Sequence, residues 1–370
     1  MRLAILSGVY YMKINKRRFL KMPEYLDLEI SIAAHKVVQD LCGVKKGESV
    51  LITLDSKGYW KVAEETAKVA AAAGAKVLLA WHNTPNGYGK VADPFLPDGL
   101  KAAIPNTDVW IEFNNQWLLY STPWEEALKE AKRVRYLFLG GLDIEQFVRL
   151  VGNVDLPLQK HFQDLVVSMT KNAKKMRITT LSGTDIAFEN DPLRPVTNEG
   201  WALEPGAHFL LGQIGWAPIE ESINGTVVFD GSISGGGEAD IGILRQPVKF
   251  TIKSGKVVKI EGGKEAQIVS DWFKRLSDPN MYNVAHVCYG FNPGAKLSGL
   301  CTEDERVWGA TEWGFGYQGP FFKGKAGSAI SHMDGICLNS SVWLDSELIM
   351  EQGKLVHSEL ADLARKLGKQ

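Results

Sequence analysis

The sequence contains few cysteines, and no two of them stand close together. Its 370 residues include four, Cys42, Cys288, Cys301 and Cys337, and no CxxC pair occurs. Four widely separated cysteines are too few to cross-link a chain of this length with disulfides. Their scarcity favours a protein of a reducing cytoplasm.

An excess of charge and long apolar runs are also missing. The chain has 42 Lys and Arg residues against 43 Asp and Glu residues, so we expect neither a nucleic-acid partner nor an anionic membrane surface. No stretch approaches the roughly 18–20 consecutive apolar residues of a membrane span. In residues 1–22 a basic cluster follows a short apolar run and no small-residue cleavage site closes it, which argues against a signal peptide. We therefore expect a soluble globular protein.

A phosphate-binding glycine loop is the third absence. The first β-rich run, SVLITL, leads into DSKGYW rather than into GxGxxG or GxxxxGK[ST]. Because those glycines let the backbone approach a phosphate, a nucleotide site is not expected here. We expect this part of the chain to be a scaffold and a platform for oligomerisation.

The first half has the pattern of stacked βα units. Residues 1–27 are expected to form an N-terminal arm, and residues 28–173 alternate β-rich runs with amphipathic segments. This order predicts a Rossmann-like α/β domain with a largely parallel sheet. A helix at residues 155–173 is expected to carry the chain out of this domain. The β-rich runs are residues 49–55, 75–83, 108–114 and 134–141, and the helical segments are residues 59–74 and 123–133.

The second half, residues 174–370, has closely spaced alternating runs and glycine-rich turns. KSGK at residues 253–256 is one such turn, and turns of this kind join antiparallel strands. The pattern predicts a mainly antiparallel α+β domain, with one helix near residues 264–278 and another at the C-terminus. We expect this domain to bind metal and to carry the catalytic site.

Two histidines and one carboxylate in this half form a candidate metal site. His332 and Asp334 are two residues apart in GSAISHMDGI, and on an extended segment such side chains project from the same face. His286 stands in a short apolar run before a proline-glycine turn. Two histidines and a carboxylate are the facial ligand set of non-haem Fe(II) enzymes, which leaves positions open for substrate and dioxygen.

Simpler interpretations of these residues stay open. An HxD pair occurs by chance in many proteins, and His286 alone equally fits a hydrogen-bonded core histidine. Glu303, Asp304 and Glu305 fit first of all a solvated acidic turn. Glu312 is the less surface-like carboxylate, because tryptophan, phenylalanine and glycine surround it.

His208 and several tryptophans are further candidates. His208 follows a Pro-Gly turn in an apolar run. An imidazole that titrates near neutral pH could serve there as an acid or base. The alternative is a core histidine whose hydrogen bonds are all satisfied within the protein. Trp216, Trp308 and Trp313 lie near the polar motifs. They could form walls for a flat ring or simply belong to the core.

Five segments in order resemble the aminopeptidase T (M29) metallopeptidase-fold family, and within it the 2,5-dihydroxypyridine 5,6-dioxygenase branch. They are PGAHFLLGQIGWAP, ESINGTVVFDGSI, HVCYGFNPGA, EDERVWGATEWGFG and GSAISHMDGI. The resemblance runs from about residue 28 to 345 and is most specific in the C-terminal half.

The peptidase branch implies a two-metal centre that this chain matches poorly. Its pattern has glutamates at the positions of Gln213 and His286, a glutamate near Glu305 and a histidine at the position of Glu312. An amide at Gln213 cannot supply a bridging carboxylate. A metallo-aminopeptidase with Zn, Co or Mn, or a non-catalytic member of the fold, therefore stays an alternative only.

The dioxygenase branch implies one Fe(II) at the positions of His286, His332 and Asp334, with His208 as the acid/base. The implied reaction opens a dihydroxypyridine or similar hydroxylated aromatic ring with dioxygen. In this branch a histidine reaches the site from a neighbouring subunit, and here Tyr120 stands at its position. The resemblance thus implies a homo-oligomer with its active site near a subunit interface. The candidate substrate contacts are Tyr120, Glu312 and Trp313.

Overall fold

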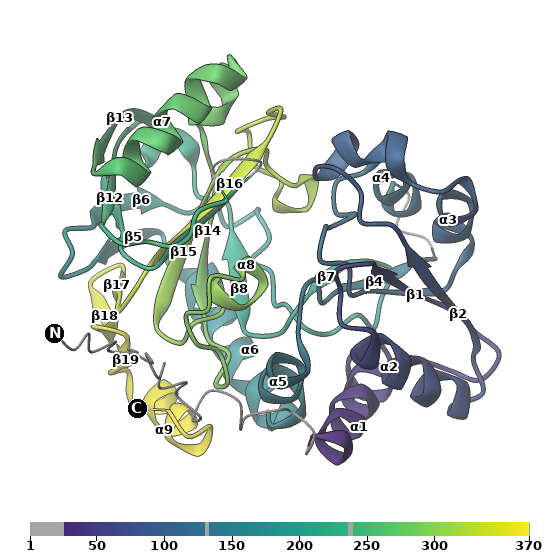
Figure 1. Ribbon diagram of the computed structural model, residues 1–370. Coiled ribbons are helices and arrows are strands. Elements are labelled where there is room, and N and C mark those ends of the chain that lie inside the picture. Colours follow the sequence, from purple (N-terminus) through teal and green to yellow (C-terminus); the bar gives the residue numbers. More distant parts are fainter. Residues whose placement is uncertain (1–25, 130–132, 236–239, 370) are drawn as a thin grey trace, which may run out of the picture.

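The computed structural model describes residues 26–129, 133–235 and 240–369 (Figure 1). Of the expected N-terminal arm, residues 1–25 lie outside this range. In the described part of the chain, strands form one parallel sheet and two antiparallel sheets, with helices around them. The predicted combination of a parallel first half and an antiparallel second half is confirmed.

The first half is built on a parallel sheet with strand order β2-β1-β3-β4-β7. One apolar core joins this sheet to α1, α2 and α5, and a second core on its other face includes residues of α3 and α4 (Figure 1). The last strand, β7, comes from beyond residue 174 and pairs in parallel with β4. The five strands are β1 (Ser49–Asp55), β2 (Lys76–His82), β3 (Val109–Glu112), β4 (Arg135–Phe138) and β7 (Gly206–Phe209).

The second half places two antiparallel sheets around a shared core. One has the order β11-β10-β16-β15-β14-β8 and the other the order β13-β12-β9-β6-β5-β17-β18-β19. In the predicted KSGK turn between β12 and β13, Ser254 and Gly255 both have positive φ, 47° and 73°, as a tight hairpin turn requires. The first sheet consists of β8 (Gln213–Trp216), β10 (Ser232–Gly235), β11 (Gly242–Ile243), β14 (Val284–Gly290), β15 (Ala310–Gly316) and β16 (His332–Cys337). The second consists of β5 (Lys175–Thr179), β6 (Asp185–Glu189), β9 (Asn224–Phe229), β12 (Val248–Lys253), β13 (Lys256–Gly262), β17 (Ser341–Leu344), β18 (Glu347–Glu351) and β19 (Lys354–Leu355).

The predicted helical segments correspond to α2, α4, α6, α7 and α9, whereas α1, α3, α5 and α8 were not predicted. Proline within the first turn and an aspartate cap at residue 155 begin α6, and both features favour a helix start. The α-helices are α1 (Asp27–His35), α2 (Trp60–Ala72), α3 (Asp98–Ala103), α4 (Thr122–Leu128), α5 (Ile144–Phe147), α6 (Leu156–Asn172), α7 (Lys264–Leu276), α8 (Cys301–Asp304) and α9 (Ser358–Lys366). Within the described ranges, no helix combines the length and the apolar character needed to cross a membrane.

Two buried carboxylates at the ends of β1 and β3 hold the loop that follows β3. Glu112 accepts hydrogen bonds from the backbone N–H of Leu118 and from the Tyr136 hydroxyl, both at 2.6 Å. Asp55 accepts one from the backbone N–H of Gln116 at 2.6 Å. The loop is therefore tied to the sheet at two points just before it reaches Tyr120.

The acidic segment at α8 is buried, so its interpretation as a solvated turn was wrong. Glu303 and Asp304 are both fully buried. Glu303 forms an ion pair with Arg149 of the first half, and Asp304 accepts the backbone N–H of Ser298 at 2.7 Å. Arg149, 154 residues away in sequence, supplies the compensating charge for Glu303, whereas a backbone donor only six residues away serves Asp304. Such partners make the burial of carboxylates tolerable.

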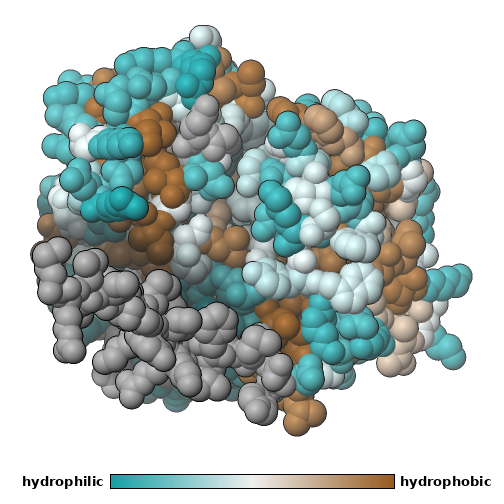
Figure 2. Space-filling model, viewed as in Figure 1, coloured by the Kyte–Doolittle hydropathy of each residue, from teal (hydrophilic) through white to brown (hydrophobic). Residues whose placement is uncertain are grey.

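On the face seen in Figure 2, the residues that the structure describes form no single large apolar area. Hydrophilic residues cover most of it, and apolar residues appear in several smaller patches. Scattered apolar residues of this kind are normal for a globular protein. All four cysteines are buried and free.

Candidate metal centre

Three neighbouring strands bring the predicted ligands together. In the register of β14, β15 and β16, His286 lies opposite Gly314 and Gly314 lies opposite Asp334, so the three form one row across the sheet. Gly314 leaves the space that the imidazole fills. A Cβ atom at residue 314 would lie 2.3 Å from Cε1 of His286.

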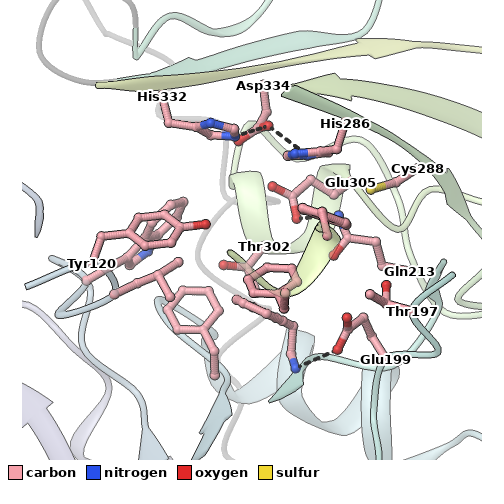
Figure 3. A pocket seen from close by; sticks show the side chains of 16 residues that line it. Tyr120, Thr197, Glu199, Gln213, His286, Cys288, Thr302, Glu305, His332 and Asp334 are labelled. Carbon is pink, nitrogen blue, oxygen red and sulfur yellow. Dashed lines mark hydrogen bonds and ion pairs between the residues drawn. The ribbon is translucent and has the colours of Figure 1, made fainter. Parts of the chain in front are cut away.

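His286, His332 and Asp334 face one another across a few ångströms (Figure 3). Oδ1 of Asp334 lies 2.8 Å from Nε2 of His332 and 3.6 Å from Nε2 of His286. The candidate ligand atoms of all three residues lie within 4.8 Å of one another. The structure therefore assembles the two histidines and the carboxylate that the sequence singled out.

Contacts behind the two imidazoles fix their orientation. Nδ1 of His332 donates to the carbonyl oxygen of Tyr317 at 2.7 Å, so in the neutral ring Nε2 presents its lone pair to the cluster. The His286 ring lies between Phe322 and His332, with centroid distances of 4.9 and 5.1 Å and interplanar angles of 24° and 19°. Both histidines are held in one orientation by their neighbours.

Glu312 stands beside the three residues as a second carboxylate. Its Oε1 lies 3.0 Å from Nε2 of His286, and the side chain is buried. Sequence reasoning made Glu312 a substrate contact. The structure places it against His286, and it is not among the residues that line the adjoining cavity.

Burial and mutual charge perturb every titratable group of the cluster. Burial, with the neighbouring charge of His332, lowers the pKa of His286 to about 4. Burial also lowers the pKa of His332, but the charge and hydrogen bond of Asp334 outweigh it and raise that pKa to about 9. Burial and the charge of Glu305 raise the pKa of Glu312 to about 7, and burial raises that of Asp334.

These groups fit a bound divalent cation. Carboxylates crowded in a buried site repel one another, and a cation offsets both the repulsion and the cost of desolvation. Neutral imidazole and carboxylate donors suit Fe(II), Zn(II), Co(II) and Mn(II) alike. The donor chemistry thus supports a metal without choosing between these ions.

A hydrogen-bond network surrounds Glu305, near which the peptidase branch implies a metal-binding glutamate. The Gln213 amide donates to Oε2 of Glu305 at 3.1 Å and accepts from Arg306 at 2.7 Å. Arg306 also donates to the same Glu305 oxygen at 2.5 Å, and Cys301 donates to the other at 2.9 Å. A buried guanidinium therefore already neutralises Glu305, which makes this carboxylate less available to a metal ion.

A small cavity adjoins the cluster and opens toward a larger one. The inner cavity has a volume of about 70 Å³ and the outer cavity one of about 470 Å³. Tyr120, His332 and Asp334 line both. The inner lining further includes Trp117, Leu119, Phe138, Thr197, Glu199, Phe209, Gln213, His286, Cys288, Thr302, Glu305, Phe321 and Phe322.

Tyr120 reaches this site within one chain. Its backbone has a φ of 65°, and its ring lies 4.9 Å from that of Tyr317. In Figure 3 the hydroxyl of Tyr120 points toward the candidate ligands. The resemblance implied that this position serves a neighbouring subunit, but no partner chain is required to bring Tyr120 to the cavity.

The structure does not bring His208 or Trp313 to the inner cavity. His208 lies on β7 with Nε2 2.9 Å from the carbonyl oxygen of Glu204, while the next residue, Phe209, lines the cavity. Trp313 is fully buried in the core with Phe188, at a centroid distance of 5.9 Å. Trp216 belongs to the same core.

Sequence reasoning missed Glu199 and Cys288. Glu199 is buried, accepts the backbone N–H of Phe209 at 3.1 Å and lines the inner cavity. Nothing in its sequence surroundings marks it, because its approach depends on how β7 and β8 are placed. Cys288 could have been found, since it stands two residues after His286 on the same strand and so projects from the same face.

Comparison with known proteins places this geometry in a family. A family model described as 2,5-dihydroxypyridine 5,6-dioxygenase matches residues 31–357. A 2,5-dihydroxypyridine 5,6-dioxygenase from Pseudomonas putida is 25% identical over 258 residues, which cover 65% of this chain and 69% of that protein.

Two solved structures share the fold. A 2,5-dihydroxypyridine dioxygenase from Pseudomonas putida KT2440 superposes with a TM-score of 0.73 at 21% identity, covering 90% of this chain and 98% of that one. AmpT from Thermus thermophilus superposes with a TM-score of 0.64 at 14% identity, covering 90% of this chain and 100% of that one. Both structures have the fold that the resemblance implied.

Proposed function

The chain belongs to the 2,5-dihydroxypyridine 5,6-dioxygenase family, a family of dioxygenase enzymes, and from this premise we propose that it is an Fe(II)-dependent ring-cleaving dioxygenase. The substrates are dioxygen and a small dihydroxypyridine or similar hydroxylated aromatic ring. The observation that carries the proposal is the convergence of His286, His332 and Asp334, with ligand atoms within 4.8 Å of one another, on the wall of a buried cavity.

In this proposal His286, His332 and Asp334 hold one Fe(II) and leave positions open for both reactants. When bound, the iron supplies the electron transfer by which a singlet ring and triplet dioxygen can react. The chain itself orients the imidazoles through Tyr317 and Phe322. The aromatic and aliphatic lining excludes water from the reacting atoms.

Tyr120 is the proposed hydrogen-bond donor to an oxygen atom of the ring. Burial, and then the charge of Asp334, raise the pKa of its phenol well above the ordinary value, so the hydroxyl keeps its proton at neutral pH. A protonated phenol stabilises a developing negative charge by donating to it. The resemblance implies a histidine at this position in the dioxygenase branch. In its place this chain thus offers a hydrogen-bond donor and not a base.

The proposed proton acceptor on the far side of the cavity is the Glu199 carboxylate. Burial raises its pKa, and the charge of His208 acts against that shift. His208, the acid/base of the sequence-based prediction, would then act on the reaction through Glu199. Its contribution stays a prediction.

The decisive experiment is a metal assay combined with oxygen uptake. Protein loaded anaerobically with Fe(II) should hold one ion per chain and consume dioxygen with 2,5-dihydroxypyridine or a hydroquinone-type phenol. His332→Ala removes one of three ligands, so its iron content and oxygen uptake should both fall at least tenfold. His357→Ala, at a partly exposed histidine beside Glu347, is the matched control and should keep both.

The competing functions give different results. Two zinc-like ions per chain and release of amino acids from peptides would support the aminopeptidase alternative. A full iron complement and unchanged turnover in His332→Ala would refute the three-ligand site. No stoichiometric metal in any preparation would indicate a non-catalytic member of the fold.

A further inference from the structure

The outer cavity is larger than a single aromatic ring requires. Its volume of about 470 Å³ falls in the range of about 300–1,000 Å³ that holds drug-sized ligands. It is continuous with the candidate site, because Trp117, Leu119 and Tyr120 line both cavities together with His332 and Asp334. A ring bound at the ligand cluster therefore has open space beside it.

The lining of this space is mainly apolar and aromatic. Tyr88 and Trp117 lie edge to face with centroids 5.3 Å apart, and Tyr120 and Tyr317 continue the aromatic wall toward the cluster. The residues that extend the apolar lining beyond the inner cavity are Tyr88, Val91, Leu300, Tyr317, Ala329 and Ile330. Such surfaces bind apolar groups by excluding water from them.

The charged groups of the outer cavity do not favour an anionic substituent. Lys90 is already paired with Glu125 at 3.0 Å. Asp240 and the candidate ligand Asp334 are further carboxyl groups of the lining, and a carboxylate repels an anion. Val91 and Ile330 also line the cavity and are 65% and 68% exposed.

We infer that the substrate is a hydroxylated aromatic ring that carries an apolar substituent of several carbon atoms. This inference rests on the proposed function, because the ring must bind at the ligand cluster for its substituent to lie in the outer cavity. Each methylene transferred from water to such a cavity strengthens binding about fourfold. A four-carbon group should therefore improve binding by at least about tenfold, even when it is only partly buried.

The test compares rings with and without the substituent on the iron-loaded enzyme. Hydroquinone, butylhydroquinone and phenylhydroquinone are bound anaerobically in a calorimeter, and oxygen uptake is then measured with each. Both substituted rings should bind, and reach kcat/KM values, at least tenfold better than hydroquinone. The butyl and phenyl compounds together separate a general apolar preference from one for a second ring.

A variant that fills part of the outer cavity tests whether the preference for substituted rings depends on this cavity. Val91→Trp narrows the outer cavity and should remove most of the advantage of the substituted rings while hydroquinone binds as before. Ile330→Trp is a second variant at an equally exposed position. Val258→Trp on β13 is the matched control: Val258 is 55% exposed and does not line the cavity, so the preference should persist.

Failure of this inference differs from failure of the proposed function. Equal or better binding of hydroquinone, or equal losses for all rings in Val91→Trp, would overturn the inference and leave the dioxygenase proposal intact. No oxygen uptake with any ring would overturn the proposed function. In that case the calorimetric comparison still decides whether the cavity selects apolar substituents.

Discussion

Replacement of Gly314 by alanine should weaken metal binding at the proposed site without unfolding the protein. The added Cβ would lie 2.3, 2.6 and 2.7 Å from Cε1, Nε2 and Nδ1 of His286. Ordinary carbon contacts are about 3.5 Å, and side chains in a close-packed interior have little room to move. The His286 ring must therefore shift by about 1 Å or rotate away.

A shift of that size exceeds what a metal site tolerates. Ligand distances vary by only about ±0.2 Å, so His286 would be lost as a ligand or bind in a strained geometry. Loss of a well-oriented ligand should weaken Fe(II) binding by at least 10–100-fold, which equals about 1.4–2.7 kcal/mol.

The assay is an anaerobic titration of Fe(II) against a competing chelator. Gly99→Ala is the control, because nothing lies within 4 Å of the Cβ it would add, and it should bind iron like the wild type. Circular dichroism and urea unfolding of the metal-free proteins establish that both variants are folded. A folded Gly314→Ala protein with wild-type iron affinity would refute the role of this glycine.

Three further outcomes are expected. Tyr120→Phe should lower kcat by about 10²-fold, because it removes one hydrogen-bond donor to a developing charge. Its iron content, measured by emission spectroscopy, should stay at the wild-type level. A fall in iron content would instead show that the hydroxyl serves the metal site. Burial raises the pKa of Glu112 to about 8, so the stability that its protonated form contributes is full below the unfolded carboxyl pKa of about 4.5 and is lost as pH rises toward 8. Urea unfolding of the metal-free protein should show a loss of about 2–3 kcal/mol in the free energy of unfolding between pH 5.5 and pH 8, and Glu112→Gln should abolish this loss. An equal dependence of the free energy of unfolding on pH in both proteins would contradict the prediction. Removal of the metal by a chelator should lower the free energy of unfolding by about 2.7 kcal/mol relative to protein with Fe(II) at 100 times its Kd, and unchanged unfolding curves would show that no ion had been bound.

Local periodicity explains which parts of the site the sequence could predict. His332 and Asp334 are two residues apart, and the alternation of side chains along a strand is enough to place them on one face. His286 belongs to another strand, and its distance from Asp334 depends on the register of three strands. For that residue the family resemblance supplied what periodicity could not.

Long-range contacts explain the errors. Glu303 was predicted to be solvated because its neighbours in sequence are acidic, yet its partner Arg149 is 154 residues away. The position of Tyr120 depends on hydrogen bonds that Asp55 and Glu112 make to the loop before it. Neither arrangement has a local signal, so both required the folded structure.

The placement of β7 has a consequence for the order in which the chain can fold. β4 cannot complete its hydrogen bonds until residues 206–209 have been synthesised, although α6 and two strands of the other sheets come first. A ribosome that has delivered only residues 28–173 has therefore made a sheet with an unprotected edge, and exposed edges invite association between chains. Protein fragments that end near residue 173 should aggregate more readily than fragments extended beyond residue 209, in which β4 is paired and β7 becomes the edge strand.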